Sequence, residues 1–163
     1  PRALTALVDP RDGEREDLAR RTLSPEQLAL GKQRLRLASF LQFTLPGAPC
    51  IYYGDEAGMA GYRDPFNRGY YPWGREDADL QDHYRGLARL KAVWEPLRRG
   101  SVQVLAAGDG RFAFRRTFEG RSVSLWCNAS PSAWTGAKQT GKVLFGNPHL
   151  PPMSFCAMEE PSC

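Results

Sequence analysis

The sequence changes its pattern near residue 100, and this change limits the folds that the chain can adopt. Before it, apolar residues recur at the spacing of helices, and after it, short apolar runs appear, two of which alternate with the period of strands. The turn signals Gly108–Asp109–Gly110 and Glu119–Gly120 separate these runs as in hairpins. The pattern therefore predicts an α+β chain in two parts, residues 1–96 and residues 97–163.

The first part opens its main helix with a capping signal. Ser24 is placed to cap the helix, Pro25 fits the first turn, and Gln27 completes a capping box. Apolar residues continue at helical spacing until Pro46–Gly47 ends the pattern. We expect a helix over this whole stretch.

An apolar run, a long loop and a second helix follow. Residues 48–53 are apolar without alternation, which is typical of a strand buried on both faces. Residues 54–78 are rich in Gly, Pro, Tyr and Asp and predict a long loop, and such loops are often functional. The periodicity then predicts a helix over residues 79–95, capped by Asp77 or Asp79.

The second part predicts a small antiparallel β-sandwich of about 60 residues, a size at which an isolated core is marginal. Its expected strands are residues 102–105, 111–118, 122–127, 143–145 and 153–158.

Charge and hydropathy exclude two classes of partner. Lys and Arg total 22 against 18 Asp and Glu, and the basic residues are scattered among acidic ones. This mixture is typical of a solvated surface, so we expect no nucleic-acid partner. No apolar run approaches the length that spans a bilayer, so we expect no membrane association.

The cysteine spacing predicts neither a metal site nor a disulfide framework. The four cysteines, Cys50, Cys127, Cys156 and Cys163, are widely spaced and show no paired Cys or His motif. Cys50 and Cys127 lie in apolar runs and are expected to be buried. We therefore expect no metal and no cofactor, and a reducing, cytoplasmic compartment of a bacterium.

One stretch carries a specific resemblance. Residues 45–59 (LPGAPCIYYGDEAGM), followed by residues 61–68 (GYRDPFNR) and Pro72–Trp73, resemble the eighth barrel strand and the next loop of the α-amylase superfamily of glycoside hydrolases. The similarity is to the branch of neopullulanase, cyclomaltodextrinase and maltogenic amylase. Residues 1–4 match the positions after the catalytic aspartate of barrel strand seven, and residues 97–163 match the C-terminal β-domain.

The resemblance implies a fold and a function for the chain. A complete (β/α)₈ barrel needs about 250 residues, so the 163 residues would form its last βα units, followed by the small sandwich. The chain would be the C-terminal portion of a retaining α-glucan hydrolase or transglycosylase. The family's three catalytic carboxylates match no position of this sequence, and the retaining mechanism needs two of them. We therefore assign no catalytic residue and expect the chain to be inactive alone.

Asp64 and Arg68 are the candidate substrate-binding residues. Their spacing lets the side chains meet across a turn, and together they offer the donors and acceptors that sugar hydroxyls need. The resemblance implies that the matching residues line the donor-side glucose subsites, while the alternative is an ordinary surface ion pair. Asp55 and Glu56 are adjacent and point to opposite sides of an extended chain, so a structural role is expected for them.

Other side chains in the same region are given structural roles. The aromatic residues of the long loop could stack on sugars, but packing is favoured, above all for Pro72–Trp73; they are Tyr62, Tyr70, Tyr71 and Trp73. His83 is expected to be solvated or to cap its helix, and His149 to lie in a loop. Arg2 matches a residue near the family's active site, and its own role stays open.

Two further interpretations remain at this point. The chain could instead be a stand-alone carbohydrate-binding or interaction module, supported by its β-domain and loop aromatics. The expected partner of the parent enzyme is an α-glucan or maltooligosaccharide.

A strand over residues 50–53 would also have unpaired edges. This predicts self-association, or a rearranged packing of the helices against the β-domain.

Overall fold

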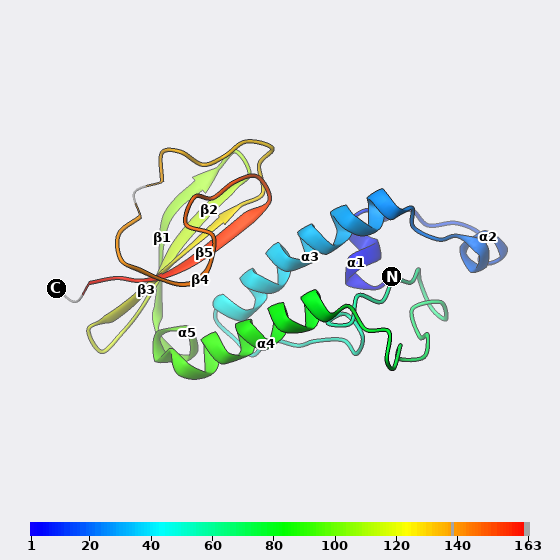
Figure 1. Ribbon diagram of the computed structural model, residues 1–163, viewed down its shortest axis with the longest axis horizontal. Coiled ribbons are helices and arrows are strands. Elements are labelled where there is room, and N and C mark those ends of the chain that lie inside the picture. Colours follow the sequence, from blue (N-terminus) through cyan, green and yellow to red (C-terminus); the bar gives the residue numbers. More distant parts are fainter. Residues whose placement is uncertain (138, 162–163) are drawn as a thin grey trace. The chain divides into compact units, whose positions relative to one another are not determined.

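The computed structural model describes residues 1–137 and 139–161 and contains helices followed by strands (Figure 1). Its elements are α1 (Ala3–Ala6), α2 (Arg15–Arg20), α3 (Pro25–Thr44), α4 (Ala78–Val93), α5 (Glu95–Arg99), β1 (Ser101–Gly108), β2 (Arg111–Phe118), β3 (Arg121–Asn128), β4 (Lys142–Gly146) and β5 (Ser154–Glu159). The α+β composition is as expected.

The chain divides into two compact units. The first holds residues 1–36 and 50–84, and the second holds residues 37–49 and the described part of residues 85–163. Both α3 and α4 therefore contribute to each unit. The boundary near residue 97 stays a prediction.

The capping signals of the two long helices are confirmed. At α3, the Ser24 amide donates to Gln27 Oε1 (2.9 Å) and the Gln27 amide donates to Ser24 Oγ (3.2 Å), which is a reciprocal capping box. At α4, the Leu80 amide donates to Asp77 Oδ1 (2.9 Å), so Asp77 is the cap.

The core of the first unit forms around Leu4, Leu35 and Leu80, which are buried together. Gly31 of α3 lies against Leu4, and a Cβ at this position would come within 2.9 Å of the Leu4 side chain. A glycine inside a helix costs stability, and here it allows α1 to pack closely against α3.

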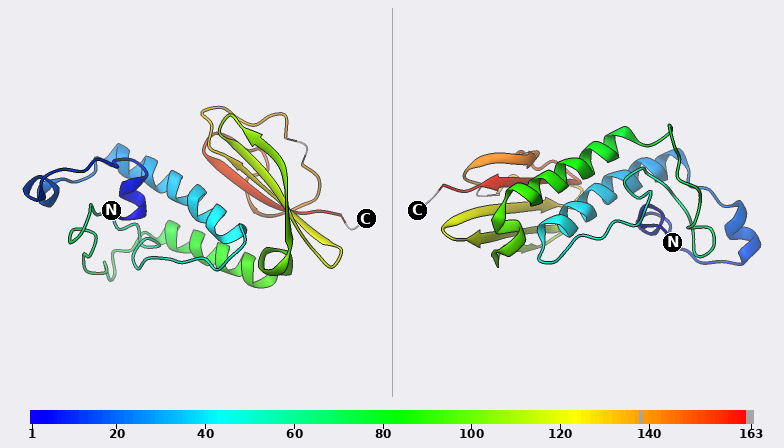
Figure 2. Two further views of the ribbon diagram at one scale, coloured as in Figure 1. Left: turned by 180° about the vertical axis from the view of Figure 1, so that it is seen from behind. Right: turned by 90° about the horizontal axis from the view of Figure 1, so that it is seen from below.

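The strands form one antiparallel sheet with the order β1-β2-β3-β5-β4 (Figure 2). The predicted turns are confirmed, because Asp109, Gly110, Glu119 and Gly120 all have positive φ angles. Two consecutive residues of this conformation are typical of the tight hairpin turns that match the twist of a sheet.

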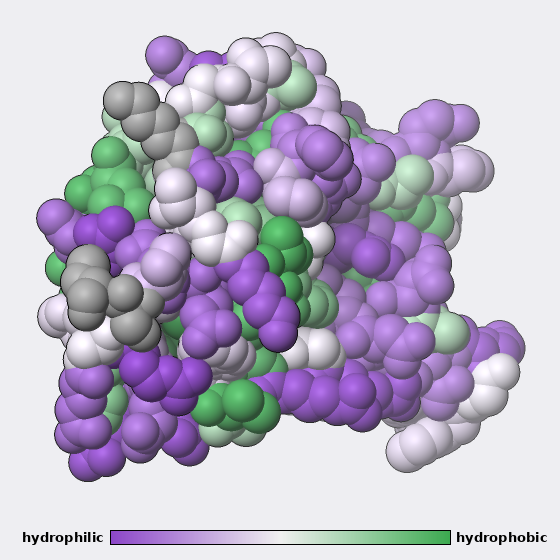
Figure 3. Space-filling model, turned by 60° about the vertical axis from the view of Figure 1, so that its left-hand side comes forward, coloured by the Kyte–Doolittle hydropathy of each residue, from purple (hydrophilic) through white to green (hydrophobic). Residues whose placement is uncertain are grey.

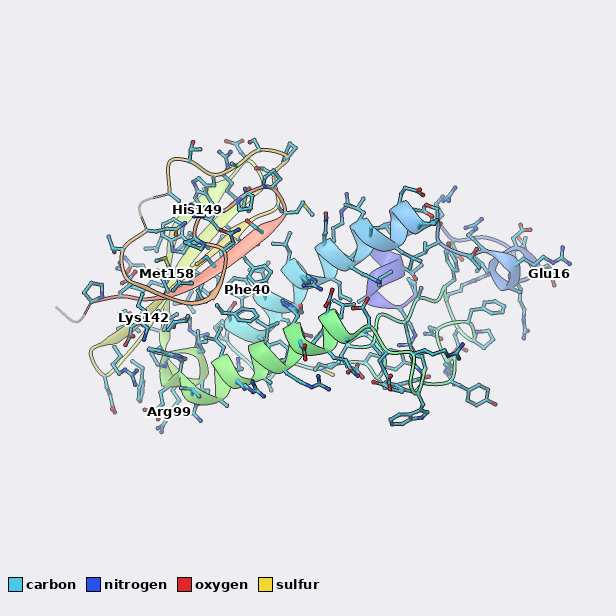
Figure 4. The ribbon with its side chains drawn as sticks, viewed as in Figure 1. Glu16, Phe40, Arg99, Lys142, His149 and Met158 are labelled. Atoms are coloured by element: carbon cyan, nitrogen blue, oxygen red, sulfur yellow. The ribbon has the colours of Figure 1, made fainter. Side chains whose placement is uncertain are left out.

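Both faces of the sheet are covered, but not by a second sheet. On one face, Phe40 of α3 stacks on Phe155 with ring centroids 4.6 Å apart, and Figure 4 shows Phe40 on the side of α3 nearest to β5. On the other face, Ala113, Trp126, Leu150, Cys156 and Met158 form a cluster that Trp134 and Ala137 cover. The predicted sandwich is thus a single sheet in the described residues, since a helix and a long connection supply its outer layers.

A buried arginine and a half-buried lysine bind the last carbonyl groups of α3. The Arg116 guanidinium donates to the Thr44 carbonyl (2.7 Å) and the Gly100 carbonyl (3.0 Å), and Lys91 Nζ donates to the Phe43 carbonyl (2.9 Å). These carbonyls lie at the C-terminal ends of α3 and α5, where backbone acceptors lack helical partners and cations are favourable. Arg116 therefore joins both helix ends to β2.

The strand predicted over residues 48–53 is wrong as a description of this structure. No strand is assigned there, and Cys50, Ile51, Tyr52 and Tyr53 are exposed rather than buried. A strand needs a neighbour to take its backbone hydrogen bonds, and none of the described ladders includes this segment. The run instead has no regular secondary structure and leads into a series of turns that begins at Tyr53.

The surface is mixed in character. Figure 3 shows one face on which hydrophobic residues form small groups among hydrophilic ones. In the described part of the chain, no helix is both long and apolar enough to cross a membrane.

Candidate functional site

Asp64 and Arg68 meet in the turn that the sequence predicted. Arg68 Nε lies 2.5 Å from Asp64 Oδ1, and both side chains remain more than half exposed. Two backbone hydrogen bonds shape the turn, from the Phe66 amide to the Arg63 carbonyl (2.9 Å) and from the Arg68 amide to the Pro65 carbonyl (3.0 Å). The pair therefore presents donors and acceptors to solvent from a defined turn.

A shallow hollow of about 300 Å³ lies at this turn. It is lined by Arg15, Arg63, Asp64, Pro65 and Phe66. Arg63 is itself fixed, because its guanidinium donates to the Gly13 carbonyl (2.9 Å) and lies 3.0 Å from Asp12 Oδ1. Cationic and anionic groups thus border one small polar recess.

A polar cluster around the buried Asp9 and Tyr62 holds the middle of the 54–77 loop. The Tyr62 hydroxyl donates to Asp9 Oδ2 (2.8 Å), and Arg11 donates to both carboxylate oxygens of Asp9 (2.5 and 3.0 Å). The Arg11 and Tyr62 hydrogen bonds hold the pKa of Asp9 well below its usual range. Burial, and then the bond to Asp9, raise the pKa of Tyr62. The cluster ties the loop to the N-terminal segment.

Arg2 anchors the beginning of the loop. Its side chain is fully buried, donates from Nη1 to the Tyr53 carbonyl (2.6 Å) and lies 3.5 Å from Asp55 Oδ1. The guanidinium also lies over the rings of Tyr52 (4.9 Å) and Tyr53 (4.7 Å). The role that the sequence left open for Arg2 is thus to hold the segment around Asp55.

The structural roles expected for Asp55 and Glu56 are confirmed. Burial raises the pKa of Asp55, and the Arg2 charge opposes part of that rise. Glu56 Oε2 accepts a hydrogen bond from the Gly54 amide (2.9 Å). Gly54 has a φ of +86°, and a Cβ there would clash with the Met59 side chain, so this turn requires glycine.

The loop aromatics divide into a buried and an exposed set. Tyr62 is buried, as packing requires, whereas Tyr70 is fully exposed and Trp73 is 80% exposed. The packing role predicted for Trp73 is therefore wrong in this structure, although its ring contacts Tyr71 with centroids 4.6 Å apart. A Pro–Trp dipeptide before a helix does not show whether other residues lie close enough to cover the tryptophan ring.

His83 is buried, so the predicted solvated or capping role is wrong. Burial, and then the nearby Arg36 charge, lower the pKa of His83 to about 4, and the ring makes an edge contact with Tyr84. His149 lies exposed in a loop, as expected.

The cysteines are partly as expected. Cys127 and Cys156 are buried free thiols, and burial raises the pKa of each to about 11. Their side chains lie on opposite faces of the sheet, since Cys127 pairs with Phe155 and Cys156 with Trp126. Cys50 is exposed, contrary to prediction, and Cys163 lies outside the described residues. No cluster of three metal-ligating side chains occurs among residues 1–137 and 139–161.

Comparison with known proteins finds relatives that match more than half of the chain. The chain is 44% identical over 95 residues to an amylopullulanase of Thermoanaerobacter thermohydrosulfuricus, covering 58% of the chain and 6% of that protein. It is 35% identical over 105 residues to a cyclomaltodextrinase of Geobacillus thermopakistaniensis, covering 62% of the chain and 18% of that protein. The chain thus spans less than a fifth of these relatives. No family model matches.

Solved structures agree with the sequence relatives. The debranching enzyme of Nostoc punctiforme superposes with a TM-score of 0.72 at 27% identity, over 81% of this chain and 32% of that one. By sequence and by structure, the chain is homologous to a part of the glycoside hydrolases of the α-amylase superfamily, in the branch of the amylopullulanases, cyclomaltodextrinases and neopullulanases.

Proposed function

We propose that this chain is a portion of an α-glucan hydrolase or transglycosylase that binds substrate through Asp64 and Arg68 and carries none of the catalytic carboxylates. In this proposal, residues 1–96 are the last βα units of a (β/α)₈ barrel and residues 97–163 are its C-terminal β-domain. The names of the relatives support an α-glucan as the substrate class, as does the soaking of the Nostoc debranching enzyme with acarbose.

The exposed Asp64–Arg68 pair is the observation that carries the proposal. The Arg68 side chain is 70% exposed and the Asp64 side chain is 60% exposed. A guanidinium donates and a carboxylate accepts, so vicinal sugar hydroxyls can bridge the two groups without being deprotonated. Because the turn already holds both side chains, binding a glucose unit would cost little additional ordering.

The exposed segment 50–53 supports the barrel part of the proposal. Ile51, Tyr52 and Tyr53 are each about 40% exposed and belong to no strand. Arg2 and Asp55 fix the end of this segment. In a barrel, neighbouring strands would cover these side chains and take the backbone hydrogen bonds.

Binding of maltooligosaccharides tests the site. We expect maltotriose to bind the 163-residue chain weakly, in the millimolar range, and we expect the double variant Asp64→Ala/Arg68→Ala to lose at least tenfold in affinity. Isothermal titration or NMR titration measures this. The matched control is Glu95→Ala/Arg99→Ala, which removes another exposed pair of the same spacing from α5. Equal binding by all three proteins would contradict the assigned site.

Turnover tests the absence of catalysis. We expect no release of reducing sugar from pullulan, cyclodextrin or maltooligosaccharide above a buffer blank. The chain should remain inactive at enzyme concentrations a thousand times those that a related full-length cyclomaltodextrinase needs. Turnover that co-purifies with the chain and disappears on Asp55→Asn would show that its own carboxylates catalyse the reaction.

The exposed loop aromatics favour one alternative, a stand-alone carbohydrate-binding or interaction module. Tyr70 and Trp73 offer ring faces to solvent, and amphipathic rings of this kind are frequent at binding surfaces. In that case Trp73→Ala should weaken maltooligosaccharide binding more than Asp64→Ala does. The same titrations therefore distinguish the two functions.

A further inference from the structure

We propose that the outer edge of β1 is a homodimerisation surface, on which β1 of a second copy pairs antiparallel with a two-fold axis at Gln103. The proposal depends on the sheet alone and is independent of glucan binding. It assigns the self-association predicted for this chain to β1 rather than to the segment 50–53.

β1 is an edge strand without the protection that edge strands usually carry. It is the first strand in the sheet order, and residues 101–104 are all exposed. Its eight residues (SVQVLAAG) include neither a charged side chain nor a proline. Charges and prolines are the common devices that keep an edge from pairing with another chain.

The opposite edge of the same sheet, β4, is protected. It has five residues, begins with Lys142 and ends at Gly146, which has a φ of +93°. Lys142 is placed opposite Glu159 of β5. A short strand with a charged first residue and a positive φ at its last residue is a poor template for pairing with another strand. Of the two edges, β4 is therefore protected against pairing and β1 is not.

Two valines extend a buried face of the sheet beyond β2. Val102 lies opposite Arg116 and Val104 lies opposite Phe114, and directly opposed residues share a face. Arg116 and Phe114 are buried, whereas Val102 is 42% and Val104 is 58% exposed. A strand added at this edge would cover both valines and satisfy the free backbone groups of β1.

The sequence of β1 fits a second copy of itself. With the axis at Gln103, Val102 of each copy lies opposite Val104 of the other, so the contact is self-complementary. A two-fold contact brings identical side chains close together, which only an uncharged strand tolerates without repulsion. The ladder of β1 is irregular between Val104 and Ala106, so the paired segment is short and the dimer should be weak and reversible.

Sedimentation velocity of the 163-residue chain from 10 μM to 1 mM tests the proposal. We expect the sedimentation coefficient to rise with concentration, and Val104→Lys to abolish the rise. Val143→Lys is the matched control, since it places the same charge on the opposite edge strand, at a valine that is also exposed (39%); it should dimerise like the wild type. Circular dichroism checks that each variant folds. A wild type that stays monomeric at 1 mM, or a loss of dimer in Val143→Lys equal to that in Val104→Lys, would overturn the proposal.

A crosslink tests the register even where a lysine variant fails to fold. In a background with Cys50 and Cys163 replaced by serine, Gln103→Cys places the two thiols opposite each other across the axis. We expect mild oxidation to give a covalent dimer for Gln103→Cys at least fivefold faster than for Ser101→Cys. Equal or slower crosslinking at Gln103 would exclude this pairing.

Discussion

Replacing Asn128 with aspartate is expected to lower the free energy of unfolding by about 3 kcal/mol at neutral pH, the cost of breaking a fully buried polar network. The change is isosteric, so it creates no cavity. It replaces the side-chain NH2 group, the only hydrogen-bond donor of the asparagine side chain, with a second oxygen acceptor, and the resulting carboxylate is negatively charged.

The surroundings of Asn128 make this exchange costly. The side chain is fully buried at the end of β3, and Nδ2 lies 2.9 to 3.0 Å from the carbonyl oxygens of Ser132, Leu150 and Pro151. Oδ1 accepts from both the amide and the hydroxyl of Ser130. A carboxylate in this position would face three carbonyl oxygens at contact distance, and it would release the connection that covers the Trp126 side of the sheet.

Urea unfolding followed by tryptophan fluorescence and circular dichroism measures the effect. Asn147→Asp is the matched control, because Asn147 is exposed and uses only its Oδ1 atom, which accepts from the His149 amide (2.9 Å). That control should change the unfolding free energy by less than about 0.5 kcal/mol. Equal stability of the two variants would show that the Asn128 network does not hold the connection.

Local signals in the sequence predicted those features whose hydrogen-bond partners lie within a few residues of each other in the chain. The capping box of Ser24 and Gln27 fixed the start of α3, and the Glu119–Gly120 turn fixed a hairpin. The run at residues 48–53 was misread as a formed strand because a strand also depends on a neighbour. Its apolar composition shows that the segment could be buried by a neighbouring strand. It does not show whether such a neighbour is present.

The same division applies to the candidate site. Asp64 and Arg68 are four residues apart, so their meeting followed from spacing. The hydrogen bond between Tyr62 and Asp9 joins residues 53 positions apart. The sequence around either residue contains no pattern that predicts the other as its partner. Asn128 was likewise missed, since an asparagine after a strand is typical of turns and gives no sign of the distant carbonyls that it meets.

Acidification is expected to destabilise the protein through His83. In the folded chain, burial and the Arg36 charge hold the pKa of His83 at about 4, whereas in the unfolded chain it returns to its ordinary value of 6.5. A depressed folded pKa means that the unfolded state takes up the proton first. The stability that neutral His83 contributes is therefore complete above pH 6.5 and decreases as the pH falls toward 4. Between pH 7 and pH 5 the loss amounts to about 2 kcal/mol.

Two histidine variants separate the contribution of His83 to the pH dependence of stability from that of carboxylates that titrate in the same pH range. His83→Gln should be less stable than the wild type at pH 7 but lose about 2 kcal/mol less of its unfolding free energy between pH 7 and pH 5. His149→Gln removes the other histidine, which is exposed in a loop, and should keep the full wild-type pH dependence. Because Asp55 has a raised pKa, its protonation favours the folded state and acts in the opposite direction. A His83→Gln variant whose stability depends on pH as steeply as the wild type's between pH 7 and pH 5 would therefore show that the His83 ring takes up a proton in the folded protein as readily as in water.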